Sequence, residues 1–487
     1  MKTSSKILSA VLVLTMLLGC MGLNVNAGNL TLPDYTMTDE QWNEYWNQVK
    51  NDNTQISLTN GRNITELNFN WHSERNGVLP KIKISKNADM SDSKTFIGYF
   101  LLADNKQQAN RVTVTGLEEK TKYYYSYNLG KDGWSEPEFY RTLSASSFKA
   151  IVVGDPQCSA TESEFADKDA KGWNTTLSTA LKKNDDTSFV ISCGDQTQTG
   201  ADYKEWAGTL APKALRNIPM VTTIGNHDHK GTNYKYYVNN PNSQLISTSK
   251  TGTPYYFSYG DVLFVVFNST NLNVFENYSL VKRAVASHPD AKWRVAIFHH
   301  DIYGTGHHAD DSSNKPLRGV YSAIMDKFGF DVVLNGHEHF YGRSYFMKND
   351  EVVDMDYSVN SAVDPDGTLY ITTASASGKN RVYEEPYSYY WLENSYMSSE
   401  LIYCTVEFTE NTFRLETRNV DDKLIDEYTI TKTSSEYEEV PPESTLLFDT
   451  DALSRVMKYE LGDYYVIYQV VESIFKAVFN FAVSLMK

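Results

Sequence analysis

Five short motifs in the middle of the chain carry Asp, Asn and His side chains in a pattern that suits metal-ion chemistry. The motifs are Gly154-Asp155-Pro156-Gln157, Gly194-Asp195, Gly225-Asn226-His227-Asp228, His299-His300 and Gly336-His337-Glu338-His339. Carboxylates and imidazoles together bind ions such as Fe, Zn and Mn. A carboxylate can bridge two such ions, and two ions roughly 3.5–4 Å apart form a hydrolytic centre. If the motifs meet in space, they predict a two-metal hydrolytic centre.

A run of strand-forming residues precedes each motif. The runs are Ala150–Val153, Phe189–Ile191, Val221–Ile224, Val295–Phe298 and Val332–Leu334. Short apolar runs of this kind are typical of buried strands. Ligands just past the ends of neighbouring strands converge on one crevice, which is where open α/β sheets bind their ligands. We therefore expect the five motifs to converge.

The segments between the motifs predict a large mixed sheet with helices. Helices are expected at Asn174–Lys183 and Arg318–Phe328, and Gly329 ends the second. Two apolar runs joined by Gly260-Asp261 predict a hairpin over residues 255–267. Further strands are expected at 369–372, 402–408, 412–417 and 428–431.

The chain divides into six parts by composition. Residues 1–27 have a basic start and an apolar core, as in a secretory signal peptide. Residues 28–54 form a polar extension with Trp42 and Trp46, and residues 55–145 alternate short strands with turns, which predicts a β-sandwich. Residues 146–432 hold the motifs, and 433–450 form an acidic linker.

The last part, residues 451–487, predicts an amphipathic helix, because Glu472 and Lys476 stand one helical turn apart. This helix could dock on the body of the protein, on a partner or on a membrane surface. At the other end of the chain, Leu17-Leu18-Gly19-Cys20 leaves a bacterial lipoprotein anchor open as an alternative to secretion.

Composition narrows the classes of function. With 487 residues the chain is too long for one small domain. Its net charge of −16 argues against nonspecific nucleic-acid binding, which requires basic patches. Loss of the signal would leave Cys158, Cys193 and Cys404, too few for a disulfide scaffold. A Cys158–Cys193 pair and simple buried thiols both stay open.

The order Asp, Gly-Asp, Gly-Asn-His-Asp, His and Gly-His-x-His resembles the calcineurin-like metallophosphoesterase superfamily. The sandwich before the motifs and the run Gly336–Ser344 make the chain most similar to the purple acid phosphatases. Leu117, Thr121 and Tyr123 resemble the tyrosine corner of fibronectin type III sandwiches. The resemblance covers about residues 55–432. It implies an α+β or α/β fold, with an N-terminal β-sandwich followed by an αββα sandwich of two mixed sheets flanked by helices.

The resemblance also implies two metal ions, divalent or trivalent, drawn from Fe, Zn and Mn. The ligands that it implies are Asp155 and His339 for the first ion, Asn226, His299 and His337 for the second, and Asp195 as the bridge between them.

His227 and His308 are implied as the catalytic residues on the substrate side. Asp228 follows His227 and is expected to orient its ring. His300 and His307 stay open as alternatives to His299 and His308, because all four lie within one short stretch.

Two positions depart from the family pattern. Purple acid phosphatases carry a Tyr three residues after the second-motif Asp, and its phenolate binds ferric iron and gives the colour; here the residue is Gln198. The wider superfamily often has a His two residues after the first Asp, and here that is Gln157. We therefore predict a colourless enzyme. Whether Gln157 or Gln198 supplies a carbonyl oxygen to the first ion stays open.

The combined expectation is a secreted phosphatase that hydrolyses small phosphate monoesters by attack of a metal-bound hydroxide. His308 or His227 would protonate the departing alkoxide. Two alternatives stay open: a phosphodiesterase acting on nucleotides or other diesters, and a cell-surface binding protein whose metal site is structural.

Overall fold

The computed structural model describes residues 30–131, 133–159, 164–271, 273–312, 314–380 and 387–434. The predicted signal peptide, the predicted C-terminal helix and most of the acidic linker lie outside the described residues. No helix within these ranges combines the length and the hydropathy that a membrane crossing requires.

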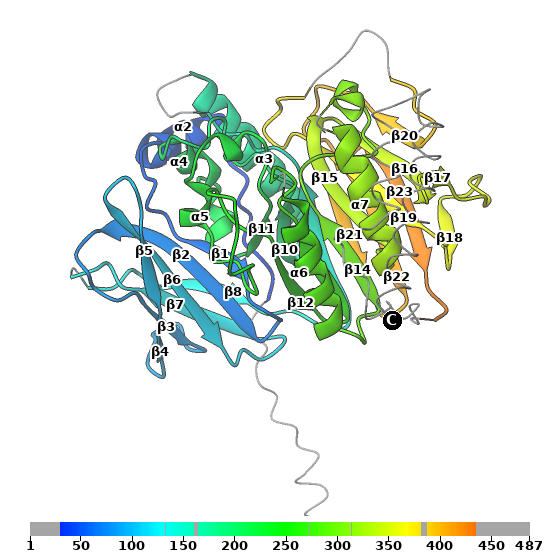
Figure 1. The fold of residues 1–487 in the computed structure, drawn as a ribbon. Coiled ribbons are helices and arrows are strands. Elements are labelled where there is room, and N and C mark those ends of the chain that lie inside the picture. Colours follow the sequence, from blue (N-terminus) through cyan, green and yellow to red (C-terminus); the bar gives the residue numbers. More distant parts are fainter. Residues whose placement is uncertain are drawn as a thin grey trace, which may run out of the picture.

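Two four-stranded sheets pack face to face in the N-terminal part of the chain (Figure 1). The first has the order β1 (Ser57–Asn60), β2 (Glu66–Glu74), β6 (Gln107–Thr115), β5 (Tyr99–Leu102), and the second β4 (Lys94–Ile97), β3 (Lys81–Ser85), β7 (Lys122–Tyr127), β8 (Glu138–Arg141). Alternate residues of β2, among them Leu67 and Phe69, share one core with Ile82 and Tyr125 of the other sheet. Tyr123 is buried, and its hydroxyl accepts a hydrogen bond from the Glu118 amide at 2.8 Å.

Two larger mixed sheets form the second part. The seven-stranded sheet has the order β11 (Met220–Thr222), β10 (Thr187–Ser192), β9 (Phe148–Val153), β21 (Ile402–Phe408), β22 (Thr412–Asn419), β23 (Leu424–Thr431), β18 (Ser361–Val363). The eight-stranded sheet has the order β12 (Tyr255–Tyr259), β13 (Val262–Val266), β14 (Trp293–Ile297), β15 (Val332–His339), β19 (Thr368–Ala374), β16 (Tyr341–Lys348), β17 (Glu351–Val352), with β20 (Leu392–Tyr396) paired to β16. The two sheets share one apolar core.

Helices cover the outer faces of both large sheets. On the seven-stranded sheet, α3 (Glu164–Lys183) packs through Trp173 and Leu177. On the eight-stranded sheet lie α6 (Val274–Ser287) and α7 (Asn314–Phe328), which cross its front in Figure 1. This is an αββα sandwich, so the predicted fold class is confirmed.

Short helices occupy the loops at the edge where the parallel strands end. These are α4 (Glu205–Thr209), α5 (Tyr234–Tyr237) and the 3-10 helices η2 (Asp228–Lys230) and η3 (His307–Asp310). A further 3-10 helix, η1 (Lys213–Arg216), precedes β11.

Several elements differ in extent from the sequence-based expectation. The helix expected from Asn174 begins at Glu164. The strand expected before the fifth motif, β15, does not stop at Leu334 but continues through that motif to His339, with a register irregularity between Asn335 and His339. The expected hairpin is present as β12 and β13, and Gly260 at its turn has φ +55°. The extension of β15 was not predicted because its last residues are polar and do not continue the apolar pattern.

The polar extension contains a docked helix, α2 (Asp39–Val49). Thr38 and Gln41 form a capping box at its start. Trp42 and Trp46 stand one turn apart and are buried against α3. The Trp42 indole also donates a hydrogen bond to Asp167 Oδ1 at 2.8 Å. The extension is therefore anchored to the second part of the chain.

A stack of three rings joins the N-terminal sandwich to the second part. The ring of His72 on β2 stacks on Tyr237 of α5 at 4.2 Å, and Tyr237 stacks on Trp206 of α4 at 4.2 Å. His72 Nε2 also donates to the Tyr236 carbonyl at 2.9 Å. His72 thus serves packing between the two parts.

Candidate metal centre

All six predicted ligands lie at one edge of the two large sheets. Asp155, Asp195 and Asn226 follow β9, β10 and β11, His299 follows β14, and His337 and His339 end β15. All are buried except Asn226, which is half-buried. Parallel strands end at the same edge, and this explains why motifs so far apart in the sequence meet.

The donors predicted for the second ion surround the free ring nitrogen of His299. His299 Nε2 lies 2.8 Å from Asn226 Oδ1, 3.1 Å from His337 Nδ1 and 3.4 Å from Asp195 Oδ2. Donors that share one ion at about 2.0–2.2 Å lie roughly 3–3.5 Å from one another. These four side chains therefore fit a common metal ion.

The donors predicted for the first ion are Asp155, Asp195 and His339. His339 Nε2 lies 3.4 Å from Asp155 Oδ1. This oxygen is buried and accepts no hydrogen bond from the residues that the structure describes, whereas Oδ2 accepts from the His337 amide at 2.9 Å. Asp155, Asp195 and His299 also have ligand atoms within 4.8 Å of one another. A buried carboxylate oxygen that accepts no hydrogen bond is a suitable ligand for a cation.

Backbone carbonyls fix the imidazoles of two ligands. His299 Nδ1 donates to the Cys193 carbonyl at 2.9 Å, and His339 Nδ1 donates to the Lys379 carbonyl at 2.7 Å. Each contact leaves Nε2 as the free donor atom facing a carboxylate.

The electrostatics of the site favour a positive charge among these donors. Burial and the neighbouring histidines hold the pKa of His337 well below its usual range, so it stays neutral as a ligand must. Burial opposes charge on His299, but Asp195 and Asp155 raise its pKa to about 10. The two carboxylates therefore stabilise a cation, and a metal ion supplies that charge more strongly.

Left-handed backbone conformations aim the donors. The residues with such φ values here are Asp155 (45°), Gln157 (41°), Asp195 (48°), His337 (78°) and His339 (66°). Each costs about 1–3 kcal/mol for a non-glycine residue and is typical of functional sites.

Two motif glycines allow the close approach of the carboxylates. A Cβ on Gly225 would lie 2.0 Å from Asp195 Oδ1, and one on Gly336 would lie 2.6 Å from Asp155 Oδ2. The glycines are therefore part of the geometry of the site.

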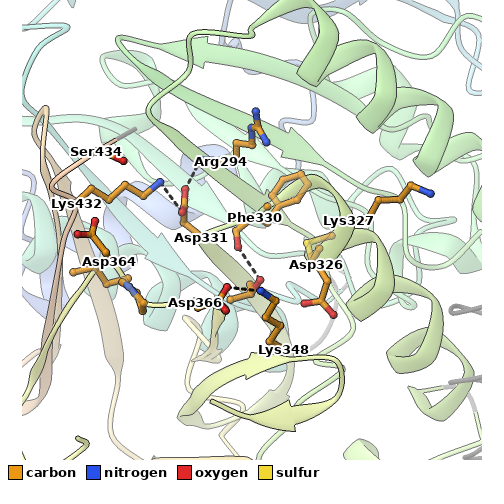
Figure 2. A pocket seen from close by; sticks show the side chains of 16 residues that line it. Arg294, Asp326, Lys327, Phe330, Asp331, Lys348, Asp364, Asp366, Lys432 and Ser434 are labelled. Atoms are coloured by element: carbon orange, nitrogen blue, oxygen red, sulfur yellow. Dashed lines mark hydrogen bonds and ion pairs between the residues drawn. The ribbon is translucent and has the colours of Figure 1, made fainter. Parts of the chain in front are cut away.

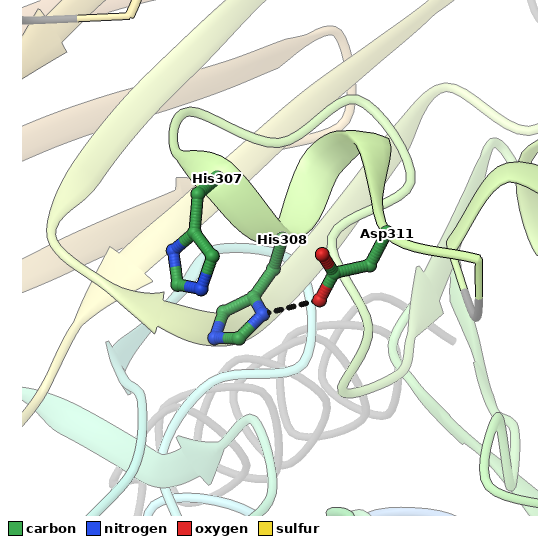
Figure 3. Close-up of side chains that lie close together, drawn as sticks. All are labelled: His307, His308 and Asp311. Carbon is green, nitrogen blue, oxygen red and sulfur yellow. Dashed lines mark hydrogen bonds and ion pairs between the residues drawn. The ribbon is translucent and has the colours of Figure 1, made fainter.

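His308 lies beside the second-ion donor His337, and Figure 3 shows it with its neighbours His307 and Asp311. Its ring is 4.5 Å from that of His337, and its Nδ1 is 2.6 Å from Asp311 Oδ2. His307 lies next to it, 3.8 Å between ring centroids, and both histidines are half-buried. His300 is instead buried behind His337, with its Nδ1 2.8 Å from Ser269 Oγ, and burial lowers its pKa to about 3.

His227 is also at the centre, but Asp228 does not orient it as we expected. The His227 amide donates to Asp195 Oδ1 at 2.8 Å, and its Nδ1 donates to the Gln198 carbonyl at 2.6 Å.

Asp228 is buried below this loop and accepts hydrogen bonds from the backbone amides of Gln196, Thr197 and Gly225. Asp228 therefore links the loops of the second and third motifs, because backbone amides of both loops donate hydrogen bonds to its carboxylate. The carboxylate that contacts a substrate-side imidazole is Asp311, which the sequence analysis missed although it stands three residues after His308.

The two glutamines have different surroundings. Gln198 Oε1 accepts a hydrogen bond from Lys379 Nζ at 3.1 Å. Gln157 Oε1 is buried and accepts no hydrogen bond from the described residues. Lys379 was not predicted, since it follows β19 outside any of the five motifs.

No disulfide joins the three cysteines that lie in the described part of the chain. Cys158, Cys193 and Cys404 are free and buried.

A cavity of about 480 Å³ lies at the opposite end of the sheets, where β14, β15 and β19 begin (Figure 2). Two ion pairs lie within its lining. Lys432 Nζ lies 2.7 Å from Asp331 Oδ1, and Lys348 forms an ion pair with Asp366. Nothing in its lining matches the chemistry of the metal centre.

Comparison with known families agrees with this geometry. Residues 148–341 match the family described as calcineurin-like phosphoesterase, and residues 53–142 match the purple acid phosphatase N-terminal domain. The chain therefore contains a calcineurin-like phosphoesterase domain, preceded by a domain of the purple acid phosphatase N-terminal type.

Individual relatives are distant. Purple acid phosphatase 15 of Arabidopsis thaliana is 22% identical over 302 residues, which cover 56% of this chain and 54% of that protein. Purple acid phosphatase 22 of the same plant is 24% identical over 331 residues, 63% of this chain and 68% of that protein. The chain thus spans about half the length of the first of these relatives.

A solved structure shares the fold. The purple acid phosphatase PPD1 from yellow lupin (Lupinus luteus) seeds superposes with a TM-score of 0.63 at 16% identity, over 80% of this chain and 77% of that one.

Proposed function

We propose that this phosphoesterase is a secreted, binuclear metal-dependent phosphatase that hydrolyses small phosphate monoesters. The observation that carries the proposal is the convergence of six donors on one buried site, with two further imidazoles, His227 and His308, beside it. The first ion would be held by Asp155 and His339, the second by Asn226, His299 and His337, and Asp195 would contact both. When bound, the ions polarise the phosphoryl group and lower the pKa of the attacking water.

His308 is suited to protonate the leaving group. The Asp311 carboxylate accepts the hydrogen on Nδ1 and stabilises the protonated ring, so the second proton is carried on Nε2. Proton transfer from Nε2 to the departing alkoxide oxygen would complete the reaction. In this arrangement His307 packs beside the His308 ring and has no role in proton transfer.

His227 is suited to hold a phosphoryl oxygen. When the ring is protonated, Nδ1–H donates to the Gln198 carbonyl and Nε2–H is left to donate to a phosphoryl oxygen. Lys230 Nζ lies 3.0 Å from Nδ1 and adds positive charge on this side. A monoester dianion presents more charge to such groups than a diester does, and this favours monoesters. The net charge of −16 is unsuited to long nucleic acids.

The test compares p-nitrophenyl phosphate with bis(p-nitrophenyl) phosphate, using the purified chain loaded with Zn²⁺, Mn²⁺ or iron. We expect kcat/KM to be at least about tenfold higher for the monoester. A preference for the diester would support a phosphodiesterase instead. Bound metal without hydrolysis of either ester, over a wide pH range, would support a binding protein with a structural metal site.

Secretion is a separate part of the proposal. It rests on the N-terminal sequence and on the similarity of the chain to purple acid phosphatases. Fractionation of the producing cells, with N-terminal sequencing of the mature protein, tests it: a start at Gly28 supports cleavage of the signal, and a lipidated Cys20 supports a cell-surface lipoprotein.

A further inference from the structure

Lys379 bridges the first-ion side of the centre and helix α3. Its ammonium lies 3.0 Å from Asp169 Oδ2 and donates to the Gln157 carbonyl at 2.7 Å, to Gln198 Oε1 at 3.1 Å and to Ser159 Oγ at 3.2 Å. The side chain is 23% exposed, and that of Asp169 only 4%. Such a set of partners holds the ammonium in one place.

The backbone of the same residue orients a predicted ligand. The Lys379 carbonyl accepts the Nδ1 hydrogen of His339 at 2.7 Å. One residue therefore contacts a ligand side chain and both of the loops that carry Asp155 and Asp195.

The hydrogen bond to Gln198 determines the charge at this position. Gln198 is a neutral amide and therefore offers no anionic donor, and its Oε1 accepts from the Lys379 ammonium, which places a positive charge behind it. The remaining donors are two carboxylates, one of them shared, and the imidazole of His339. A trivalent ion gains more than a divalent ion from each added anionic ligand and is repelled more strongly by a nearby cation.

We propose that Lys379 is a positioning residue that makes the first-ion site select divalent over trivalent metal ions. Its ammonium sets the local charge, and its carbonyl orients His339. This inference rests on the two-ion centre of the proposed function, and it concerns which ions that centre accepts.

The test is equilibrium competition between Zn²⁺ and Ga³⁺, a trivalent ion that undergoes no redox change, in citrate buffer with the full chain. Metal analysis of the separated protein gives the ratio of bound Ga³⁺ to bound Zn²⁺. For Lys379→Met we expect this ratio to rise about tenfold, because the positive charge that contacts the Gln157 and Gln198 loops is removed. For Asp169→Asn we expect it to fall, because the ammonium loses its counter-charge.

The opposite directions expected for the Ga³⁺ to Zn²⁺ ratio in the two variants distinguish a charge effect from a packing effect. Lys348→Met is the matched control, since this lysine pairs with Asp366 far from the centre, and it should leave the ratio unchanged. An unchanged ratio in both test variants, or a shift of both in the same direction, would overturn the inference. If Lys379→Met does not fold, the direction of the Asp169→Asn shift decides. Failure of the unaltered chain to bind Zn²⁺ would instead overturn the proposed function.

Discussion

Substitution of Gly225 by Ala should dismantle the metal centre without touching any ligand. The new Cβ would lie 2.0 Å from Asp195 Oδ1 and 2.3 Å from the Asp195 backbone nitrogen. Ordinary contact begins at 3.4 Å, so the carboxylate must retreat by about 1.4 Å. The contact with the Asp195 backbone nitrogen cannot be relieved by a change of side-chain rotamer.

The magnitude follows from the tolerance of metal coordination. Metal–oxygen distances vary by only about ±0.2 Å in well-formed sites. Removal of a merely orienting partner already costs about 10–100-fold in affinity. Displacement of the bridging carboxylate should therefore weaken binding of both ions by at least roughly 100-fold. The overpacked core should lose about 1–3 kcal/mol of unfolding free energy.

The assay combines metal analysis, monoester turnover and urea unfolding of the Gly225→Ala protein. Gly116→Ala is the control, because Gly116 has φ +77° but no atom within 4 Å of the added Cβ. The control should lose about 1–2 kcal/mol from its left-handed backbone and keep its metal and its activity. Normal metal content in Gly225→Ala would refute the reasoning that this glycine exists to admit Asp195.

Four further predictions test the site. Asp195→Asn should lose both activity and most bound metal, and retention of both on metal analysis would contradict its bridging role. His308→Ala should slow monoester turnover by about 10²–10⁴-fold with near-normal metal content; loss of metal would mean that its role is ligation. Iron-loaded protein should show no strong visible band, and a purple sample would mean that a tyrosine reaches the metal. Removal of metal by a chelator should lower the melting temperature, because buried Asp155 and Asp195 lose their counter-charge; an unchanged melting curve would argue against bound ions at these residues.

The sequence predicted the large features of the fold because they are repeated, local signals. Apolar runs before each motif identified the strands at the site, and Gly260 and Gly329 identified a turn and a helix end. The extent of β15 was missed, because His337 and His339 interrupt the apolar pattern although the backbone still pairs with β19. The sequence analysis noted Trp42 and Trp46 but did not predict that they are buried, because their burial depends on α3, more than a hundred residues away.

For the site, residue types were predictable and their orienting partners were not. Carboxylates and imidazoles in ordered motifs indicate a metal centre, but hydrogen bonds formed after folding decide what each one contacts. Asp228 stands next to His227 in sequence, yet its carboxylate faces amides of the second motif. Lys379 lies 222 residues from Gln157 and belongs to no motif. Only the crossing of β19 beside β15 brings it to the centre.

The ring stack of His72, Tyr237 and Trp206 has a consequence for how the protein unfolds. Tyr237 follows the third motif in the chain. Through His72, the N-terminal sandwich therefore contacts the loop region that supplies Asn226 and His227. Removing the sandwich would expose two stacked aromatic rings and leave the Tyr236 carbonyl without its partner. The two parts are therefore expected to melt in one cooperative calorimetric transition, and a phosphoesterase part expressed alone should have a poorly ordered third motif.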